Sequence, residues 1–176
     1  MVVELMGNKA GWLTLYAGIA GGADIILLPE LPYNIDNVVE AVLRRAEEGK
    51  YFSIVAMAEG CFDIAEAAMK KKERLAKRAE RGERTATNRV AMQIEKATGF
   101  ETRVCVPGHM QRGGSPSPYD RVLATQFGTH AAKLVEADHY GVAVAMKNNI
   151  VTENPLKAVA GKTKLVPETC DMLTVA

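Results

Sequence analysis

The chain has 176 residues, the length of one ordinary domain, and 48% of them are hydrophobic, which is enough for a sizeable core. The net charge is +1, so overall charge favours neither an acidic nor a basic partner. No apolar run approaches the roughly 20 residues of a membrane-spanning helix, and residues 1–10 lack the pattern of a signal peptide. These features exclude a helical membrane anchor within the sequence and predict a cytoplasmic globular protein.

Short apolar strands alternate with helices in the first 60 residues. The patterns predict strands over residues 2–6, 25–28 and 52–58, and helices over residues 11–20 and from a cap at Asn34 or Asp36 to Gly49. Strands that alternate with helices form parallel βαβ units. The predicted fold is therefore α/β with a parallel sheet in a three-layer domain.

A helical pattern covers residues 65–97, with a break at Gly82-Glu83. Its first half, from Lys70 to Arg84, is strongly basic, which is one feature of a nucleic-acid-binding arm. Glutamates are interleaved with these cations, however, and no aromatic residue is available there for stacking on bases. We therefore favour a solvent-exposed helix and expect no nucleic-acid partner.

The remaining patterns predict a strand over 101–106, a helix over 118–136 and a strand over 141–145 that turns at Asn148-Asn149. We expect residues 1–154 to form one domain, with a helical basic insertion at about 63–98. We expect residues 155–176 to form a tail that needs a partner surface. Three cysteines without a CxxC pair favour buried free thiols over a metal site, with Cys105 inside an apolar strand.

The most informative segment covers residues 103–121. An apolar run ends at Pro107-Gly108, the polar residues His109, Gln111 and Arg112 follow, and a glycine-rich turn precedes a helix that begins near Pro116 to Pro118. Open α/β sheets bind ligands where a strand passes into a helix in this way. The side chains and the first N–H groups of the helix are donors, so the segment predicts a phosphate site.

Three segments should meet at one edge of the sheet, because each is expected to follow the carboxyl end of a parallel strand. They are Met6-Gly7-Asn8, Glu59-Gly60 and the loop from Arg103 to Arg112. By itself, Glu59 is as consistent with a helix cap or a salt bridge, and His109 with an ordinary loop histidine. Together with two arginines they predict a site for a phosphorylated sugar, with Glu59 accepting hydrogen bonds from hydroxyl groups.

Three motifs resemble those of the 6-phosphofructokinases. They are Arg103 with Gly108-His109, Gln111-Arg112-Gly113-Gly114 and Asp120-Arg121; Met6-Gly7 with Ala10-Gly11-Trp12 and residues 17–22; and Val55-Ala56-Met57-Ala58-Glu59-Gly60. The resemblance covers nearly the whole chain. It implies that Met6, Gly7, Glu59, His109 and Arg112 hold fructose 6-phosphate. It also implies that Arg103 reaches the sugar phosphate of a neighbouring subunit, and hence a homo-oligomer.

The sequence also departs from this family, whose members are about twice as long. The glycine-rich nucleotide loop and the Thr-Ile-Asp segment with the catalytic aspartate are missing, which implies a carboxyl-terminal portion without a catalytic residue of its own. Asn8 stands where many ATP-using members have arginine. Tyr51 and Phe52 stand where allosteric bacterial members have basic residues. Together with the extra basic helix after Cys61, the second difference resembles the less regulated branch, which includes pyrophosphate-using and mixed-donor enzymes.

The resemblance implies magnesium-assisted phosphoryl transfer to fructose 6-phosphate in glycolysis, which gives fructose 1,6-bisphosphate. The Mg²⁺ would be bound mainly with the donor, ATP or pyrophosphate, in the missing amino-terminal half. This chain would supply the sugar clamp and would be inactive alone, and its tail over residues 155–176 would pack on the missing amino-terminal domain. The alternative is a stand-alone sugar-phosphate-binding or regulatory module without catalysis.

Overall fold

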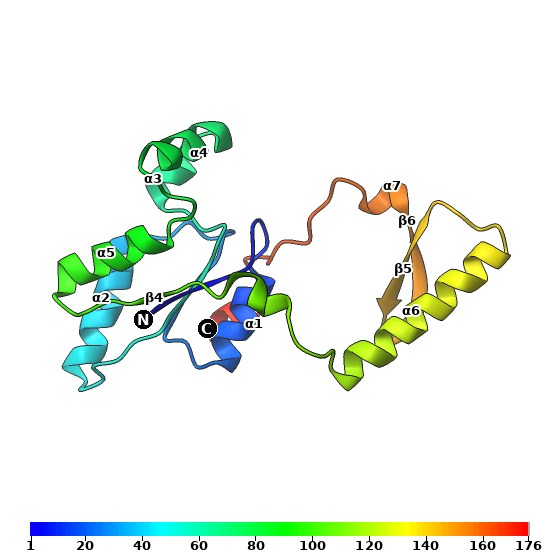
Figure 1. Cartoon of the computed structure of the whole chain (residues 1–176), viewed down its shortest axis with the longest axis horizontal. Helices are drawn as coiled ribbons and strands as arrows, with labels where there is room; N and C mark the ends of the chain where they lie inside the picture. Colours follow the sequence, from blue (N-terminus) through cyan, green and yellow to red (C-terminus); the bar gives the residue numbers. More distant parts are fainter. Residues whose placement is uncertain (176) are drawn as a thin grey trace. The chain divides into compact units, whose positions relative to one another are not determined.

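The computed structural model describes residues 1–175, which form two compact units. The first contains Met1–Gln111 and the chain from Thr163 onward, and the second contains Arg112–Lys162 (Figure 1). This differs from the expected domain over 1–154 with a separate tail, because the chain leaves the first unit after Gln111 and returns to it at Thr163. Ala176, the last residue of the expected tail, lies outside the described residues.

The first unit contains a four-stranded sheet in the order β2-β3-β1-β4, and every pair of neighbours is parallel. The strands are β1 (Val2–Leu5), β2 (Ile25–Leu27), β3 (Val55–Ala58) and β4 (Val104–Cys105). All four residues of β3 are buried, as expected for a central parallel strand with helices on both faces. The predicted parallel sheet is therefore confirmed.

Helices cover both faces of this sheet and give the predicted three layers. They are α1 (Trp12–Ala20), α2 (Ile35–Glu47), α5 (Thr87–Thr98) and α8 (Met172–Val175). One core cluster joins strand residues such as Val55 and Met57 to α2 and α5, and a second joins Leu15 of α1 to Leu28 and Val166. Because side chains alternate along a strand, each face of the sheet has its own core.

The returning segment, from Thr163 to Val175, packs within the first unit. Val166 is 3% exposed in the core cluster around α1, and its N–H donates to Glu30 Oε1 at 2.9 Å. Helix α8 also contacts α1. This part of the expected tail therefore has a partner surface in its own chain.

The expected helical segment over 65–97 consists of α3 (Ile64–Ala67), α4 (Lys71–Glu80) and α5. Gly82 lies at the predicted break and has φ +68°, a left-handed conformation that glycine adopts without strain. Of the two residues expected as the cap of α2, the structure selects Asn34, whose side chain accepts from Asp36 N–H at 3.0 Å.

The second unit contains α6 (Pro118–Glu136), β5 (Val142–Lys147), β6 (Ile150–Pro155) and α7 (Leu156–Val159). The two strands form an antiparallel hairpin, and its turn at Asn148-Asn149 has positive φ at both residues. His130 Nε2 lies 2.9 Å from Glu153 Oε1 and joins α6 to the hairpin.

No helix within residues 1–175 is both long and apolar enough to cross a bilayer.

The cysteines differ in exposure. Cys61 is buried but Cys105 is exposed, so the expectation of a buried thiol at 105 is wrong. The reason is that β4 is a two-residue edge strand, paired only with β1.

Candidate functional site

The segments that follow β1 and β3 lie beside each other at the carboxyl edge of the sheet. Glu59 N–H donates to Leu5 O at 2.8 Å, which aligns the two strand ends. Gly7 N–H points to Glu59 Oε1 at 3.5 Å, the outer limit for a hydrogen bond. The sheet therefore brings Met6, Gly7 and Asn8 next to the Glu59 carboxylate, as expected for neighbouring parallel strands.

Gly60 allows the close approach of these two segments. A Cβ atom at this position would lie 2.0 Å from Asn8 O, 2.6 Å from Asn8 C and 2.7 Å from Gly7 O. These are backbone atoms, which no side-chain rotation can remove. Only glycine at position 60 is compatible with this path of the loop that carries Asn8.

The segment after β4 is a 3₁₀ helix, η1 (Gly108–Arg112), rather than the open loop expected from the sequence. Gln111 Oε1 accepts from Met6 N–H at 3.0 Å and so holds η1 against the end of β1. His109 is exposed on η1. Arg112 is also exposed, follows Gln111 directly and is the first residue of the second unit.

Arg103 lies at the opposite edge of the sheet. It precedes β4, and its carbonyl accepts from Val2 N–H at 2.8 Å, at the start of β1. Four residues of β1 separate this level from Met6, or about 13 Å at roughly 3.3 Å per residue. The expectation that Arg103 lies at the carboxyl edge with the other residues is therefore wrong, because it precedes its strand. Its side chain is 74% exposed and pairs with Glu101 at 2.9 Å.

Helix α6 begins at Pro118 as predicted, but its amino end is capped by its own side chains. Ser117 Oγ accepts from Asp120 N–H at 3.2 Å, and Asp120 Oδ2 accepts from Ser117 N–H at 3.2 Å. This capping box uses two N–H groups and places a carboxylate at the helix start. The expectation that this helix start offers donors to a phosphate is therefore not supported.

Glu30 is a residue of this edge that sequence reasoning missed. Its carboxylate accepts from Gly11 N–H at 2.9 and 3.1 Å and from Val166 N–H at 2.9 Å. It thus fixes the start of α1 and the returning chain. The signal was present, because Glu30 follows the predicted strand over 25–28 just as Glu59 follows its own strand.

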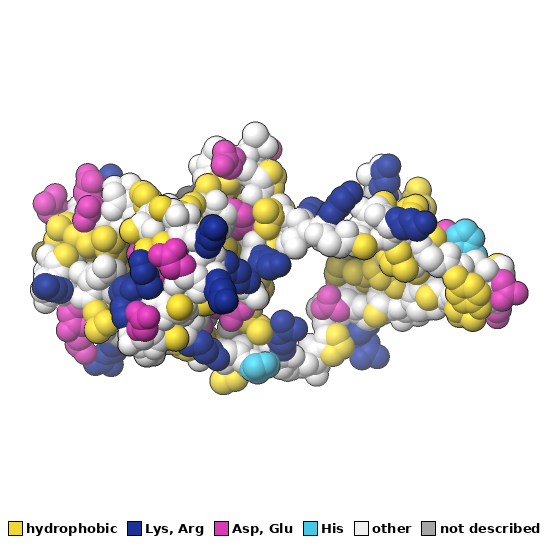
Figure 2. All heavy atoms as spheres, turned by 90° about the horizontal axis from the view of Figure 1, so that it is seen from above, with side chains coloured by type: hydrophobic (Ala, Val, Ile, Leu, Met, Phe, Trp, Pro, Cys, Tyr) yellow, Lys and Arg dark blue, Asp and Glu magenta, His cyan; other side chains and the backbone are white. Residues whose placement is uncertain are grey.

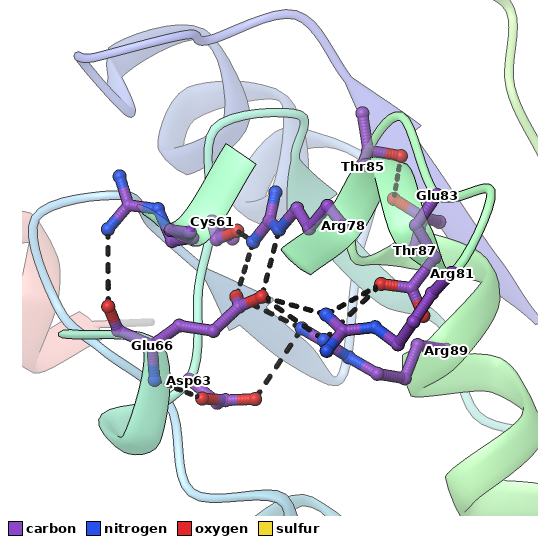
Figure 3. A network of polar contacts seen from close by, with 10 residues as sticks. Cys61, Asp63, Glu66, Arg78, Arg81, Glu83, Thr85, Thr87 and Arg89 are labelled. Atoms are coloured by element: carbon purple, nitrogen blue, oxygen red, sulfur yellow. Dashed lines mark hydrogen bonds and ion pairs between the residues drawn. The ribbon is translucent and has the colours of Figure 1, made fainter. Parts of the chain in front are cut away.

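The basic insertion is held by a buried carboxylate, Glu66 of α3 (Figure 3). Arg78 of α4 is 5% exposed and donates to both Glu66 oxygens, at 3.0 and 2.5 Å. Arg81 and Arg89 also contact Glu66, at 3.2 and 3.1 Å. The prediction of a solvent-exposed basic helix is therefore wrong for Arg78, because the acid that pairs with it lies outside the helix.

Burial raises the pKa of Glu66, but hydrogen bonds from Arg78 and Arg89 and their positive charges outweigh it, and the pKa falls to about 2. A second buried carboxylate, Glu4 of β1, accepts from Thr85 Oγ1 at 2.6 Å and from Thr87 Oγ1 at 2.5 Å. Glu66 therefore connects α3 to α4 and α5, and Glu4 connects the start of α5 to the sheet.

The family model described as "Phosphofructokinase" matches residues 1–135, and the chain belongs to this family. It aligns with the carboxyl-terminal portion of the curated relatives, and the resemblance seen in the motifs is confirmed.

The curated relatives that the chain matches include enzymes named as ATP-dependent and enzymes named as pyrophosphate-dependent. The chain is 51% identical over 167 residues to an ATP-dependent 6-phosphofructokinase of Spirochaeta thermophila, covering 95% of this chain and 46% of the relative. It is 40% identical to a pyrophosphate–fructose 6-phosphate 1-phosphotransferase of Amycolatopsis methanolica, covering 95% of this chain and 49% of the relative. The chain thus spans about half the length of the curated relatives it matches.

Solved structures confirm the fold class. Phosphofructokinase from Saccharomyces cerevisiae matches with a TM-score of 0.71 and 31% identity, over 89% of this chain and 20% of that chain. A pyrophosphate-dependent phosphofructokinase from Marinobacter aquaeolei matches with a TM-score of 0.73 over 94% of this chain and 41% of that chain. Its identity is 22%, so this second likeness concerns the fold alone.

Proposed function

We propose that this chain supplies the fructose 6-phosphate-binding half of a 6-phosphofructokinase. The observation that carries the proposal is the carboxyl edge of the sheet, where the Glu59 carboxylate lies beside Met6, Gly7 and Asn8. The hydrogen bond from Met6 N–H to Gln111 joins η1, with His109, to the same edge. A carboxylate and an imidazole are suitable partners for sugar hydroxyls.

The proposed role of this half is to position the acceptor. Glu59 and His109 orient the sugar, and Arg112 neutralises its 6-phosphate, so that the 1-hydroxyl faces the phosphoryl donor. Phosphoryl transfer depends mainly on positioning and charge neutralisation. We assign the catalytic aspartate, the donor loop and the donor, ATP or pyrophosphate, to the other half of the enzyme.

Arg103 has a separate role in this proposal. Its place at the amino edge, about 13 Å along the strand from Met6, puts it out of reach of the site in its own sheet. Its exposed guanidinium is available to the sugar phosphate of a neighbouring subunit. The proposal therefore includes a homo-oligomer.

Within residues 1–175, no group of three or more His, Cys, Asp or Glu side chains is placed to hold a metal ion. In this proposal magnesium binds with the phosphoryl donor, in the other half of the enzyme.

The sugar site is tested by calorimetry of the chain with fructose 6-phosphate. Arg112→Ala should weaken binding roughly 10- to 150-fold, because a guanidinium on a phosphate dianion contributes about 1.5–3 kcal/mol. Arg44→Ala removes an exposed guanidinium from α2 and serves as the control, with unchanged affinity expected. Equal affinities of the Arg112 variant and the parent would show that the site is misassigned.

A coupled assay separates a portion of an enzyme from a stand-alone binding module. The chain alone should show no turnover with ATP or pyrophosphate, because loss of an acid–base residue and of donor positioning costs far more than about 10²–10⁴-fold. Co-expression with the amino-terminal half of a close relative should restore turnover. Turnover by the chain alone would contradict the proposal, and sugar binding without complementation would favour the binding module.

A further inference from the structure

Helix α1 has no cap of its own at its amino end. Gly11 stands at the N-cap position without a side chain, and the first turn contains no acidic residue. The first N–H groups of a helix need acceptors, and negative charge is favourable beside them. Glu30, which follows β2, provides both, because its carboxylate accepts from Gly11 N–H at 2.9 and 3.1 Å. The cap of α1 therefore comes from another part of the fold.

The Glu30 carboxylate contacts the backbone of two distant segments. Besides Gly11 N–H, it accepts from Val166 N–H in the returning segment at 2.9 Å. Lys and Arg side chains gather on the side of the first unit on which α3 and α4 lie (Figure 2), and Glu66 takes arginines of that region as its partners. Glu30 differs from Glu66, because its three hydrogen bonds fix the course of the main chain.

Gly11 lies directly against Glu30. A Cβ atom at position 11 would be 2.9 Å from Glu30 Oε2 and 2.8 Å from Leu28 Cδ2. Gly11 is also buried, so water has little access to its N–H group. A buried N–H group that loses its acceptor is costly. The start of α1 therefore has to follow the position of the Glu30 carboxylate.

The loop after β1, residues 6–11, is held at both ends. Gln111 Oε1 accepts from Met6 N–H at its start, and Glu30 accepts from Gly11 N–H at its end. Between these anchors lie residues 7 and 8, which belong to the proposed sugar site. A site whose residues are held in place before the ligand arrives loses less conformational freedom on binding. The affinity of this loop for a ligand should therefore depend on Glu30.

The single tryptophan reports on this arrangement. Trp12 follows Gly11 directly, its Nε1–H donates to Lys164 O at 2.9 Å, and the Lys164 ammonium lies 5.5 Å from the centre of its ring. The returning segment thus contacts both Trp12 and Glu30. A change at Glu30 that releases this segment should alter the emission of Trp12 while the rest of the first unit stays folded.

We propose that Glu30 is a positioning residue for the sugar site. Through Gly11 it holds the loop after β1 in the conformation that presents residues 6–8 to the ligand. Through Val166 it fastens the returning segment beside that loop. Glu30 acts on the sugar through the backbone of the loop and not by contact. The identity of the ligand rests on the proposed function, whereas the anchoring of the loop does not.

The test compares variants of the 176-residue chain by calorimetry with fructose 6-phosphate. Glu30→Ala removes the anchor and should weaken binding roughly tenfold. Glu30→Asp keeps the charge but withdraws both oxygens by one methylene group, so it should weaken binding as well. Glu30→Gln keeps one oxygen at the original reach and should bind almost as well as the parent. The matched control is Glu40→Ala, which removes an exposed carboxylate from α2 and should not change the affinity.

Two further measurements separate positioning from a general loss of stability. In Glu30→Ala and Glu30→Asp, amide hydrogen exchange should accelerate more in residues 6–11 and 163–166 than in α5, and Trp12 emission should shift to longer wavelength. Unfolding in urea defines the conditions under which each variant is folded, and affinities are compared there. If Glu30→Ala does not fold, Glu30→Asp carries the comparison.

The outcomes separate this inference from the proposed function. Parental affinity in folded Glu30→Ala or Glu30→Asp overturns the positioning role, and so does a loss that is equally large in Glu30→Gln. Exchange that accelerates as much in α5 as in residues 6–11 shows a general loss of stability and also overturns it. If the parent chain does not bind fructose 6-phosphate, the proposed function fails. Local acceleration at residues 6–11 then still supports the anchor, and parental exchange there overturns it.

Discussion

Glu66→Gln should lower the free energy of unfolding of the first unit by about 3 kcal/mol at pH 7, the range for breaking a buried ion pair. The Glu66 carboxylate accepts from Arg78 at 3.0 and 2.5 Å, and Arg78 is only 5% exposed. An amide leaves that buried guanidinium without a counter-charge. The chain's single tryptophan, Trp12 of α1, reports unfolding of the first unit in urea.

The effect should depend on pH with a defined sign. The pKa of Glu66 is lowered from 4.5 to about 2 in the folded protein, so the unfolded chain takes up the proton first as pH falls. The stabilisation is complete above about pH 4.5 and is lost between pH 4.5 and 2. The difference between the parent and Glu66→Gln should therefore shrink over that range.

The control for this prediction is Glu73→Gln on α4. Glu73 pairs with Lys77 at 3.2 Å, and both side chains are about half exposed, so this pair contributes at most about 1 kcal/mol. Equal destabilisation by the two variants, or a Glu66→Gln effect that persists unchanged at pH 2, would show that the network in Figure 3 does not stabilise the fold.

Gly60→Ala should disrupt the site as well as the fold. Its Cβ would lie 2.0 Å from Asn8 O, and the other close atoms also belong to the backbone of residues 7 and 8. The loop after β1 must therefore move away from Glu59. We expect a loss of about 1–3 kcal/mol or more in stability, and at least a tenfold loss in affinity for fructose 6-phosphate.

The control for Gly60→Ala is Gly128→Ala in α6. A Cβ at Gly128 would have no atom within 4 Å, and alanine favours a helix over glycine by about 0.5–1 kcal/mol. This variant should be neutral or slightly more stable. A Gly60→Ala variant with parental stability and parental sugar affinity in calorimetry would contradict the close packing of the two loops.

The sequence by itself determined the elements and one edge of the sheet. Apolar runs identified β1, β2 and β3, Asn34 identified the start of α2, and alternation of strands and helices implied that the strands are parallel. Because the carboxyl ends of parallel strands meet at one edge, the sequence also placed Met6 to Asn8 beside Glu59. These features depend on residues near one another in the chain, which is why local patterns reveal them.

The tertiary structure decided which distant residues meet. It paired Arg78 with Glu66, Glu4 with Thr85 and Thr87, and Glu30 with Val166 N–H. It also left Arg103 at the far edge, because Arg103 precedes β4 and pairs with the start of β1. Local periodicity determines which face of a helix or strand is apolar. The partner of a buried charged side chain depends instead on which oppositely charged group lies next to it in the folded protein. That choice is made by contacts across the fold.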